Sequence, residues 1–166
     1  MKNRVAPIFL SLALAAVAPA AAQDAVSADA VAALPATKSG KLAAPAAGKG
    51  QVVFYRPGSL MGAALGCTIY DNGKQIARLG SGKYWVHAAE PGKALYNTKA
   101  ENVDQLNMEI EPGETYFVKC KIGMGVMSGR PNISPATVAE FSGKAKGLKL
   151  WEPDGKAKSE LEKTTN

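Results

Sequence analysis

The chain has 166 residues and a formal net charge of +6, from 20 Lys and Arg against 14 Asp and Glu. The basic residues are dispersed, those near the C-terminus are mixed with acidic ones, and no stretch alternates basic with aromatic residues. This pattern argues against a nucleic-acid-binding protein and allows at most a peripheral contact with a membrane.

The first 22 residues have the pattern of a secretory signal peptide. Two basic residues are followed by an uncharged apolar run over residues 5–17, and alanines 20–22 supply the small residues that a signal peptidase recognises. The run is shorter than the roughly 20 residues that a membrane-spanning helix needs. We therefore expect cleavage before Gln23 and export to the periplasm or the extracellular space. No Cys lies at the expected cleavage site, so no lipid anchor is expected there.

Two further segments are predicted to lie outside the folded domain. Residues 23–50 are rich in Ala, Pro, Gly, Ser and Lys, and such a composition buries too little apolar surface to offset the ordering of its backbone. We expect a disordered linker there, in which residues 25–34 form a helix only transiently. Residues 152–166 are expected to be a flexible charged tail. The remaining residues, 51–151, fit a single domain.

Short apolar segments separated by turn motifs predict that this domain is all-β. The turns are Asn72-Gly73, Pro91-Gly92 and Pro112-Gly113, each typical of a hairpin. Regularly spaced short strands favour a small antiparallel β-sandwich of about seven strands. The expected strands are residues 51–56, 67–71, 74–79, 83–88, 93–100, 105–110 and 115–122.

The last of these strands alternates cleanly. Residues 116, 118, 120 and 122 are apolar and share one face, whereas Lys119 and Lys121 share the other face with Phe117. A half-buried strand fits this pattern.

A short C-terminal helix should follow the strands. Ser134 resembles a helix N-cap and Pro135 a first helical residue, which predicts a helix over residues 135–141. Residues 147–151 could add a last strand before Pro153.

The turn motifs and their order are similar to those of a known bacterial family. The motifs are Tyr55-Arg56-Pro57, Asn72-Gly73-Lys74, Gly82-Lys83-Tyr84, Pro91-Gly92-Lys93 and Pro112-Gly113-Glu114-Thr115-Tyr116-Phe117. Over residues 50–141 the chain resembles the exported proteins of the domain of unknown function 2846 family, and its turns also resemble small surface β-domains of the Pro-Glu-Gly-Ala type. The resemblance implies an envelope-associated β-sandwich with no assigned activity. Many relatives are lipoproteins, and this chain differs from them because it lacks the lipobox Cys.

The two cysteines, Cys67 and Cys120, both fall on expected strands and are expected to face the core. An even cysteine count in an exported chain is typical of a disulfide. Two buried free thiols are the alternative, because a bridge requires Cα atoms within about 7 Å of each other. The sequence leaves both open.

Catalytic and metal-binding patterns are lacking in the sequence. His87, the sole histidine, has no partner at ligand spacing, which favours a packed or solvent-facing side chain. No Gly-x-Ser-x-Gly motif is present, and residues 80–83 lack the spacing of a phosphate-binding loop. We therefore predict no catalytic, metal-binding or cofactor-binding residues.

Two loops have an unusual composition. Residues 58–66 read Gly-Ser-Leu-Met-Gly-Ala-Ala-Leu-Gly, and residues 123–131 read Gly-Met-Gly-Val-Met-Ser-Gly-Arg-Pro. Since each turn reverses the chain, both loops should lie at the same end of the sandwich. Their apolar side chains either fold inward and cap that end or form an exposed, adaptable patch for a partner. The candidate partner-binding residues are Arg56, Leu60, Met61, Met124, Met127 and Arg130.

These features favour a non-enzymatic envelope module with a binding or structural role, whose partner is an envelope protein, a peptide or a glycan. The alternative is a periplasmic enzyme or enzyme inhibitor that acts through residues 58–66 and 123–131. A structural or stress-related surface protein without a small ligand is a third reading.

Overall fold

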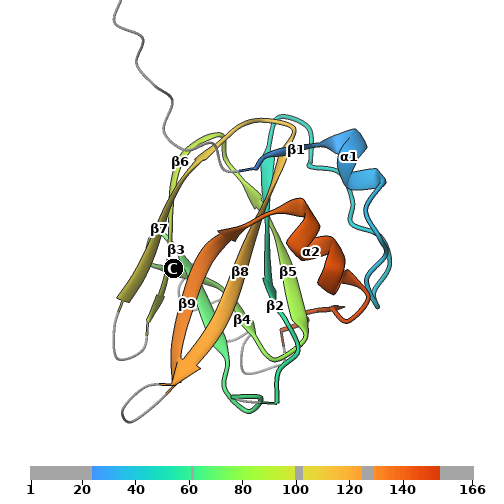
Figure 1. The fold of residues 1–166 in the computed structure, drawn as a ribbon. Coiled ribbons are helices and arrows are strands. Elements are labelled where there is room, and N and C mark those ends of the chain that lie inside the picture. The colour runs from blue at the N-terminus through green and yellow to red at the C-terminus, as the bar shows by residue number, and fades with distance from the viewer. Residues whose placement is uncertain (1–23, 61, 100–102, 125–128, 154–166) are drawn as a thin grey trace, which may run out of the picture.

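The computed structural model describes residues 24–60, 62–99, 103–124 and 129–153, and it arranges them as two packed sheets with helices on one side (Figure 1). The expected signal peptide, most of the expected tail, Met61 and Met127 lie outside the described residues. No helix among the described residues is long and apolar enough to cross a membrane.

The first sheet has six strands and the second has four. The first contains, in order, β1 (Val26–Ser27), β8 (Glu114–Met124), β2 (Gly50–Arg56), β5 (Lys83–Ala89) and β10 (Lys149–Leu150), with β9 (Gly129–Ala136) paired to β8. The second contains, in order, β4 (Lys74–Leu79), β3 (Cys67–Asp71), β6 (Gly92–Lys99) and β7 (Val103–Ile110). The predicted all-β sandwich is confirmed, and each expected strand matches one of β2 to β8 to within two residues at either end. Two pairings, β2 with β8 and β5 with β10, are parallel, so the first sheet is mixed rather than purely antiparallel.

The predicted turns are present, but only one of the three closes a hairpin. Asn72 and Gly73 both have positive φ, at 47° and 84°, and join the paired strands β3 and β4. Gly92 and Gly113 also have positive φ, at 114° and 81°. However, the turns that contain them lead from β5 to β6 and from β7 to β8, and each of these steps passes from one sheet to the other. The expectation of a hairpin at these two turns is wrong, because a turn motif fixes the reversal of the chain but not the partner of the next strand.

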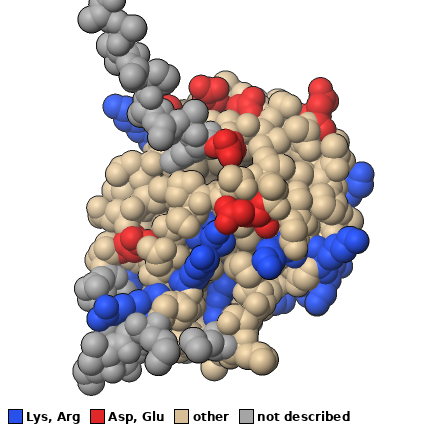
Figure 2. Space-filling model, in the orientation of Figure 1, with Lys and Arg blue, Asp and Glu red and all other residues tan. Residues whose placement is uncertain are grey.

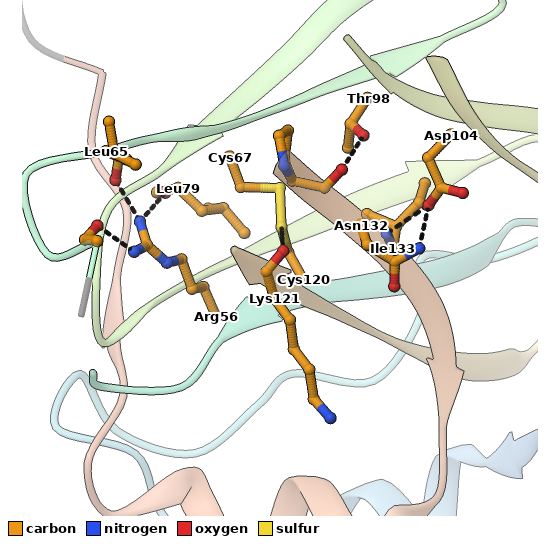
Figure 3. Close-up of a disulfide and its surroundings, with 12 residues drawn as sticks. Arg56, Leu65, Cys67, Leu79, Thr98, Asp104, Cys120, Lys121, Asn132 and Ile133 are labelled. Carbon is orange, nitrogen blue, oxygen red and sulfur yellow. Dashed lines mark hydrogen bonds between the residues drawn. A yellow bond between two sulfur atoms is a disulfide. The ribbon is translucent and has the colours of Figure 1, made fainter. Parts of the chain in front are cut away.

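The main core lies between the two sheets, and a disulfide crosses it. The fully buried residues of this core include Val52, Phe54, Ile69, Leu79, Tyr96 and Val118. Cys67 on β3 is bonded to Cys120 on β8, with their Cα atoms 6.6 Å apart (Figure 3). The structure thus selects the disulfide from the two alternatives that the sequence left open.

A second core covers the outer face of the first sheet. Outward-facing Val53, Tyr55 and Phe117 pack against α2 (Val138–Ala145) and against residues 24–49, which include α1 (Ala28–Ala32) (Figure 1). In that N-terminal segment the apolar side chains Val26, Val31, Leu34 and Leu42 are buried. The structure therefore replaces the expected disordered linker with a packed segment. The physical reason is that the apolar outer face of the central strands requires a cover.

The helix α2 begins later than the sequence indicated. Thr137 is its N-cap: the Thr137 hydroxyl accepts a hydrogen bond from the Glu140 amide, and the Glu140 carboxylate accepts one from the Thr137 amide. Ser134 and Pro135 instead belong to β9, which pairs with β8 alone. Proline is tolerated in such a strand because one of its edges needs no ladder hydrogen bond. The helix therefore starts at the capping box of residues 137–140 and not at the Ser134-Pro135 motif.

Candidate binding site at the loop end

The loop end is the end of the sandwich formed by the described residues of the segment 57–66, between β2 and β3, together with the paired ends of β8 and β9. Leu65 from the first segment packs against Gly129 and Ile122 of the second: a Cβ on Gly129 would lie 2.3 Å from Leu65 Cδ1 and 2.7 Å from Ile122 Cγ2. Glycine at position 129 therefore makes room for the leucine. The two segments that the sequence placed at one end do lie side by side.

Much of the segment 123–131 is strand rather than loop. Gly123 pairs with Arg130, and Met124 pairs with Gly129, within the β8–β9 ladder. Arg130 lies on β9 with an exposed side chain. The expectation of an irregular loop over residues 123–131 is therefore wrong for its described residues, because the pairing of β8 with β9 continues past Ile122.

Arg56 does not flank an exposed patch, as the sequence suggested, but is only 2% exposed. Its guanidinium donates hydrogen bonds to the carbonyl oxygens of Leu65, of Gly62 at 2.6 Å and of Leu79 at 3.4 Å (Figure 3). Burial lowers the pKa of Arg56, yet an arginine remains protonated in proteins. Arg56 is thus an internal brace that joins the backbone at Gly62 and Leu65 to that at Leu79.

The apolar residues of this segment divide between two environments. Leu65 is 41% exposed and packs against Ile122 and Gly129, whereas Leu60 is 99% exposed. The Gly62 carbonyl accepts hydrogen bonds from the Leu65 amide and from the Arg56 guanidinium, which hold these residues in place. The described residues of this segment therefore include one leucine that is exposed to solvent and one that is partly packed.

A cavity of about 490 Å³ adjoins this segment, between the end of β2, the lysine face of β8 and α2. Its lining residues are Tyr55, Arg56, Pro57, Ser59, Lys119, Cys120, Lys121, Ile122, Glu140 and Lys144. Figure 2 shows basic side chains gathered on this face of the molecule, next to a smaller acidic group. The cavity has the volume of a small-molecule site.

The basic side chains of the cavity come from two neighbouring elements. Lys119 and Lys121 project from the same outer face of β8, and Lys119 lies directly beside Tyr55 of β2 in the parallel ladder. Glu140 and Lys144 are four residues apart on α2 and therefore share one side of the helix. Lys119 and Glu140 form an ion pair that joins the strand to the helix. The hydrogen bond from Lys119, and then that from the Thr137 amide, lowers the pKa of the Glu140 carboxyl.

Tyr55 is a lining residue of the cavity whose hydroxyl is buried. Its side chain is fully buried and contacts Phe141 edge-to-face, with ring centroids 5.3 Å apart. Its hydroxyl has no hydrogen-bond partner among the described residues. Burial, and to a lesser degree the charge of Glu140, raises the pKa of Tyr55 to about 12. The phenol is therefore protonated at neutral pH, and its hydroxyl is enclosed between the first sheet and α2.

His87 does not line this cavity and is a packed histidine, one of the two environments that the sequence favoured. Its Nε2 is 3.1 Å from Asp71 Oδ2, and its ring stands edge-to-face on Tyr96. The described residues contain no group of three or more His, Cys, Asp and Glu side chains that could hold a metal ion.

The sequence predicts only some of the residues that line the cavity. The alternation predicts that Lys119 and Lys121 share one face, but nothing in the sequence distinguishes Tyr55 from the other residues of its apolar strand. Glu140 and Lys144 lie on a helix whose start was misplaced. A capping-box pattern at residues 137–140 is the signal that would have placed both on one side of a helix facing β8.

The fold and the cavity together define an all-β sandwich with a basic cavity at one end. Residues 46–132, more than half of the chain, match the family described as protein of unknown function (DUF2846), and the chain belongs to this family. No curated protein and no solved structure matches it.

Proposed function

We propose that this protein is a non-enzymatic binding module of the cell envelope, exported by its N-terminal signal peptide, and that it holds an envelope protein, peptide or glycan at the loop end. The observation that carries the proposal is the cavity of about 490 Å³ beside the exposed Leu60. Binding sites are typically preformed concave surfaces with a few polar groups on an apolar lining. This cavity combines both kinds of lining residue.

The packing around the cavity supports this role. Three carbonyl oxygens hold the guanidinium of Arg56, and the Lys119–Glu140 pair holds α2 against β8. A rigid site loses less conformational entropy when a partner binds. The arrangement therefore favours recognition by a pre-organised surface over closure of a flexible loop.

Site-specific photo-crosslinking in intact cells tests the proposal. A benzoylphenylalanine probe replaces Leu60 in the full-length chain, and the matched control carries the probe at Val103, a 58% exposed residue outside the cavity. We expect a discrete adduct from position 60 on a mature chain that begins at Gln23, and no such adduct from position 103. Adding Lys121→Glu and Lys144→Glu should weaken the adduct. The same adducts from both positions, or none from position 60, would reject the loop end as the binding site.

A further inference from the structure

The exposed apolar side chains of the domain are concentrated at one end. Among the described residues, the large apolar side chains that are exposed are Leu60 at 99%, Val103 at 58% and Leu65 at 41%. Leu60 and Leu65 belong to the loop end, and Val103 begins β7 at its margin, where it lines a surface hollow together with Arg130 of β9. A single exposed apolar residue is ordinary on a protein surface, but a concentration at one end is typical of a contact surface.

Leu60 is the most exposed of the three, and the backbone beside it is held from a neighbouring turn. The Ser59 amide donates a hydrogen bond to Ser81 Oγ at 2.9 Å, and Ser81 Oγ donates one to the Ser59 carbonyl at 3.1 Å. The Leu60 carbonyl accepts a further bond from the Ala63 amide. A side chain presented in this way loses less conformational entropy when it is buried by a partner.

The same end of the domain is basic. Two carboxylates of the adjoining elements β7 and α2 are engaged within the protein: Asp104 accepts hydrogen bonds from Asn132 and Ile133, and Glu140 pairs with Lys119. The exposed basic side chains are Arg78 against Gly66, Lys121 on β8, Arg130 on β9, and Lys149, which pairs with Lys83 beside the end of β2.

Acidic side chains gather at the opposite end, where β2 begins. Glu90 follows β5 and pairs with Lys49, Glu111 follows β7, and Glu114 begins β8. Figure 2 shows acidic side chains mainly in the upper half of the molecule and basic ones mainly in the lower half, which contains the loop end in Figure 1. A negatively charged surface would therefore attract the domain with its loop end foremost.

The combination of apolar and basic side chains indicates the kind of surface. An anionic bilayer accepts both, because apolar side chains enter the boundary between headgroups and acyl chains while Lys and Arg contact the headgroups. A soluble polyanion would contact the basic side chains but would leave Leu60 in water. A bilayer also requires no pocket, since it is contacted by residues that project from the protein.

From these features we infer that the loop end docks on the surface of an anionic phospholipid bilayer. Leu60 enters the boundary between headgroups and acyl chains, and Arg78, Lys121, Arg130 and Lys149 face the headgroups. The inference goes beyond the proposed function, because the domain itself contacts the lipid without an envelope protein, peptide or glycan.

Co-sedimentation of the mature chain, residues 23–166, with lipid vesicles tests the inference. The signal peptide is left out because it would itself enter the bilayer. We expect binding to vesicles of equal parts phosphatidylcholine and phosphatidylglycerol, and much weaker binding to phosphatidylcholine alone. Leu60→Ser should weaken the binding about tenfold, because less apolar surface leaves water.

Matched pairs of substitutions separate the loop end from overall charge. Arg78→Gln with Lys121→Gln removes two charges at the loop end and should weaken vesicle binding at least tenfold, at about fivefold for each charge. Lys74→Gln with Lys93→Gln removes two exposed charges from strand ends that point away from the loop end, and should change binding by less than about twofold. Unaltered circular dichroism of each variant shows that the fold is retained.

Fluorescence quenching by brominated acyl chains tests insertion directly. Leu60→Trp places a reporter at the loop end, Glu109→Trp places one on an exposed position of β7 near the opposite end, and the wild type gives the background of Trp85 and Trp151. We expect quenching beyond the background for Leu60→Trp alone. The inference is overturned if anionic vesicles do not bind, if the two charge variants weaken binding equally, or if Leu60→Ser binds like the wild type and Leu60→Trp is not quenched.

The proposed function is read separately, from the adduct at position 60 in intact cells. If that adduct forms while purified protein does not bind anionic vesicles, only the membrane inference fails. If vesicles bind through Leu60 and no discrete adduct forms, the envelope partner fails while the membrane contact stands.

Discussion

Arg56 has a different role from the one its place in the sequence indicates. It follows an apolar strand and precedes Pro57, a position typical of a surface charge at the start of a loop. The carbonyl oxygens that accept its hydrogen bonds belong to Gly62, Leu65 and Leu79, and only the folded loop brings them together. No local pattern encodes that convergence. The same holds for Tyr55, whose hydroxyl becomes distinctive only once α2 encloses it.

Replacement of Arg56 tests the brace. We expect Arg56→Met to lower the free energy of unfolding by about 2–4 kcal/mol, because buried carbonyls lose a charged donor and a buried polar group without a partner costs about 1–3 kcal/mol. Urea denaturation measures the loss, and hydrogen exchange should show faster exchange at the Leu65 amide.

The matched control for this prediction is Arg78→Met. Arg78 lies against Gly66 of the same segment but is exposed, and an exposed substitution is expected to change stability by about 0.5 kcal/mol or less. Equal effects of the two variants would show that Arg56 contributes no more than an ordinary surface charge.

At the scale of whole elements, the sequence predicted the strands well but not all of their partners. Turn chemistry is local, and Asn72-Gly73 and Gly113 adopt the positive φ that their residue types favour. Pairing is not local: β8 lies beside β2 because their outward residues Tyr55, Phe117 and Lys119 share a face under α2. The parallel pairing therefore could not be predicted from the turns.

The start of α2 shows how two local signals compete. Ser134-Pro135 and Thr137 with Glu140 are both helix-start patterns, two to three residues apart. Ile133 and Ala136 are buried when residues 129–136 extend as β9 along β8. That burial favours the strand and moves the helix start to Thr137.

The disulfide joins β3 of one sheet to β8 of the other, so its loss should loosen the contact between sheets. The two cysteines are 53 residues apart, and closing a loop of such length typically stabilises a protein by about 2–4 kcal/mol. We expect Cys67→Ala with Cys120→Ala to lower the free energy of unfolding by about that amount, measured by urea denaturation.

Reduction supplies the control for the cysteine variant. A thiol reductant should destabilise the wild type to a similar degree and should leave the double variant unchanged. If reduction of the wild type does not alter its unfolding midpoint, the bridge contributes nothing measurable to stability.

At the scale of the molecule, the domain is larger than its strand pattern indicates. Val26, Val31, Leu34 and Leu42 are separated by alanines and polar residues, so the segment has no sustained hydrophobic period. Its burial follows from the apolar outer face of the first sheet, which becomes evident only when the strands are paired. Composition alone therefore predicted a linker.

A pair of adjacent substitutions tests whether the N-terminal segment belongs to the domain. Val31 is 1% exposed and Ala30 is exposed. We expect Val31→Asp to lower the free energy of unfolding by about 2–4 kcal/mol, because it places a charge in an apolar core. Ala30→Asp should change it by about 0.5 kcal/mol or less. Thermal denaturation of both variants checks this, and two equally neutral substitutions would restore the interpretation of residues 23–50 as a linker.

The pairing of β1 and β10 also determines the order in which the domain can assemble. Val26 of β1 pairs with Thr115 of β8, and Lys149 of β10 pairs with Lys83 of β5, so both ends of the domain are held by strands distant in sequence. Folds dominated by such distant contacts form slowly, since long loops must close before any contact is gained. A chain emerging N-terminus first leaves β1 and the central strand β2 without their shared neighbour until β8 has emerged. The first sheet therefore cannot be completed until β8 has been synthesised, which delays the final fold until most of the domain has emerged.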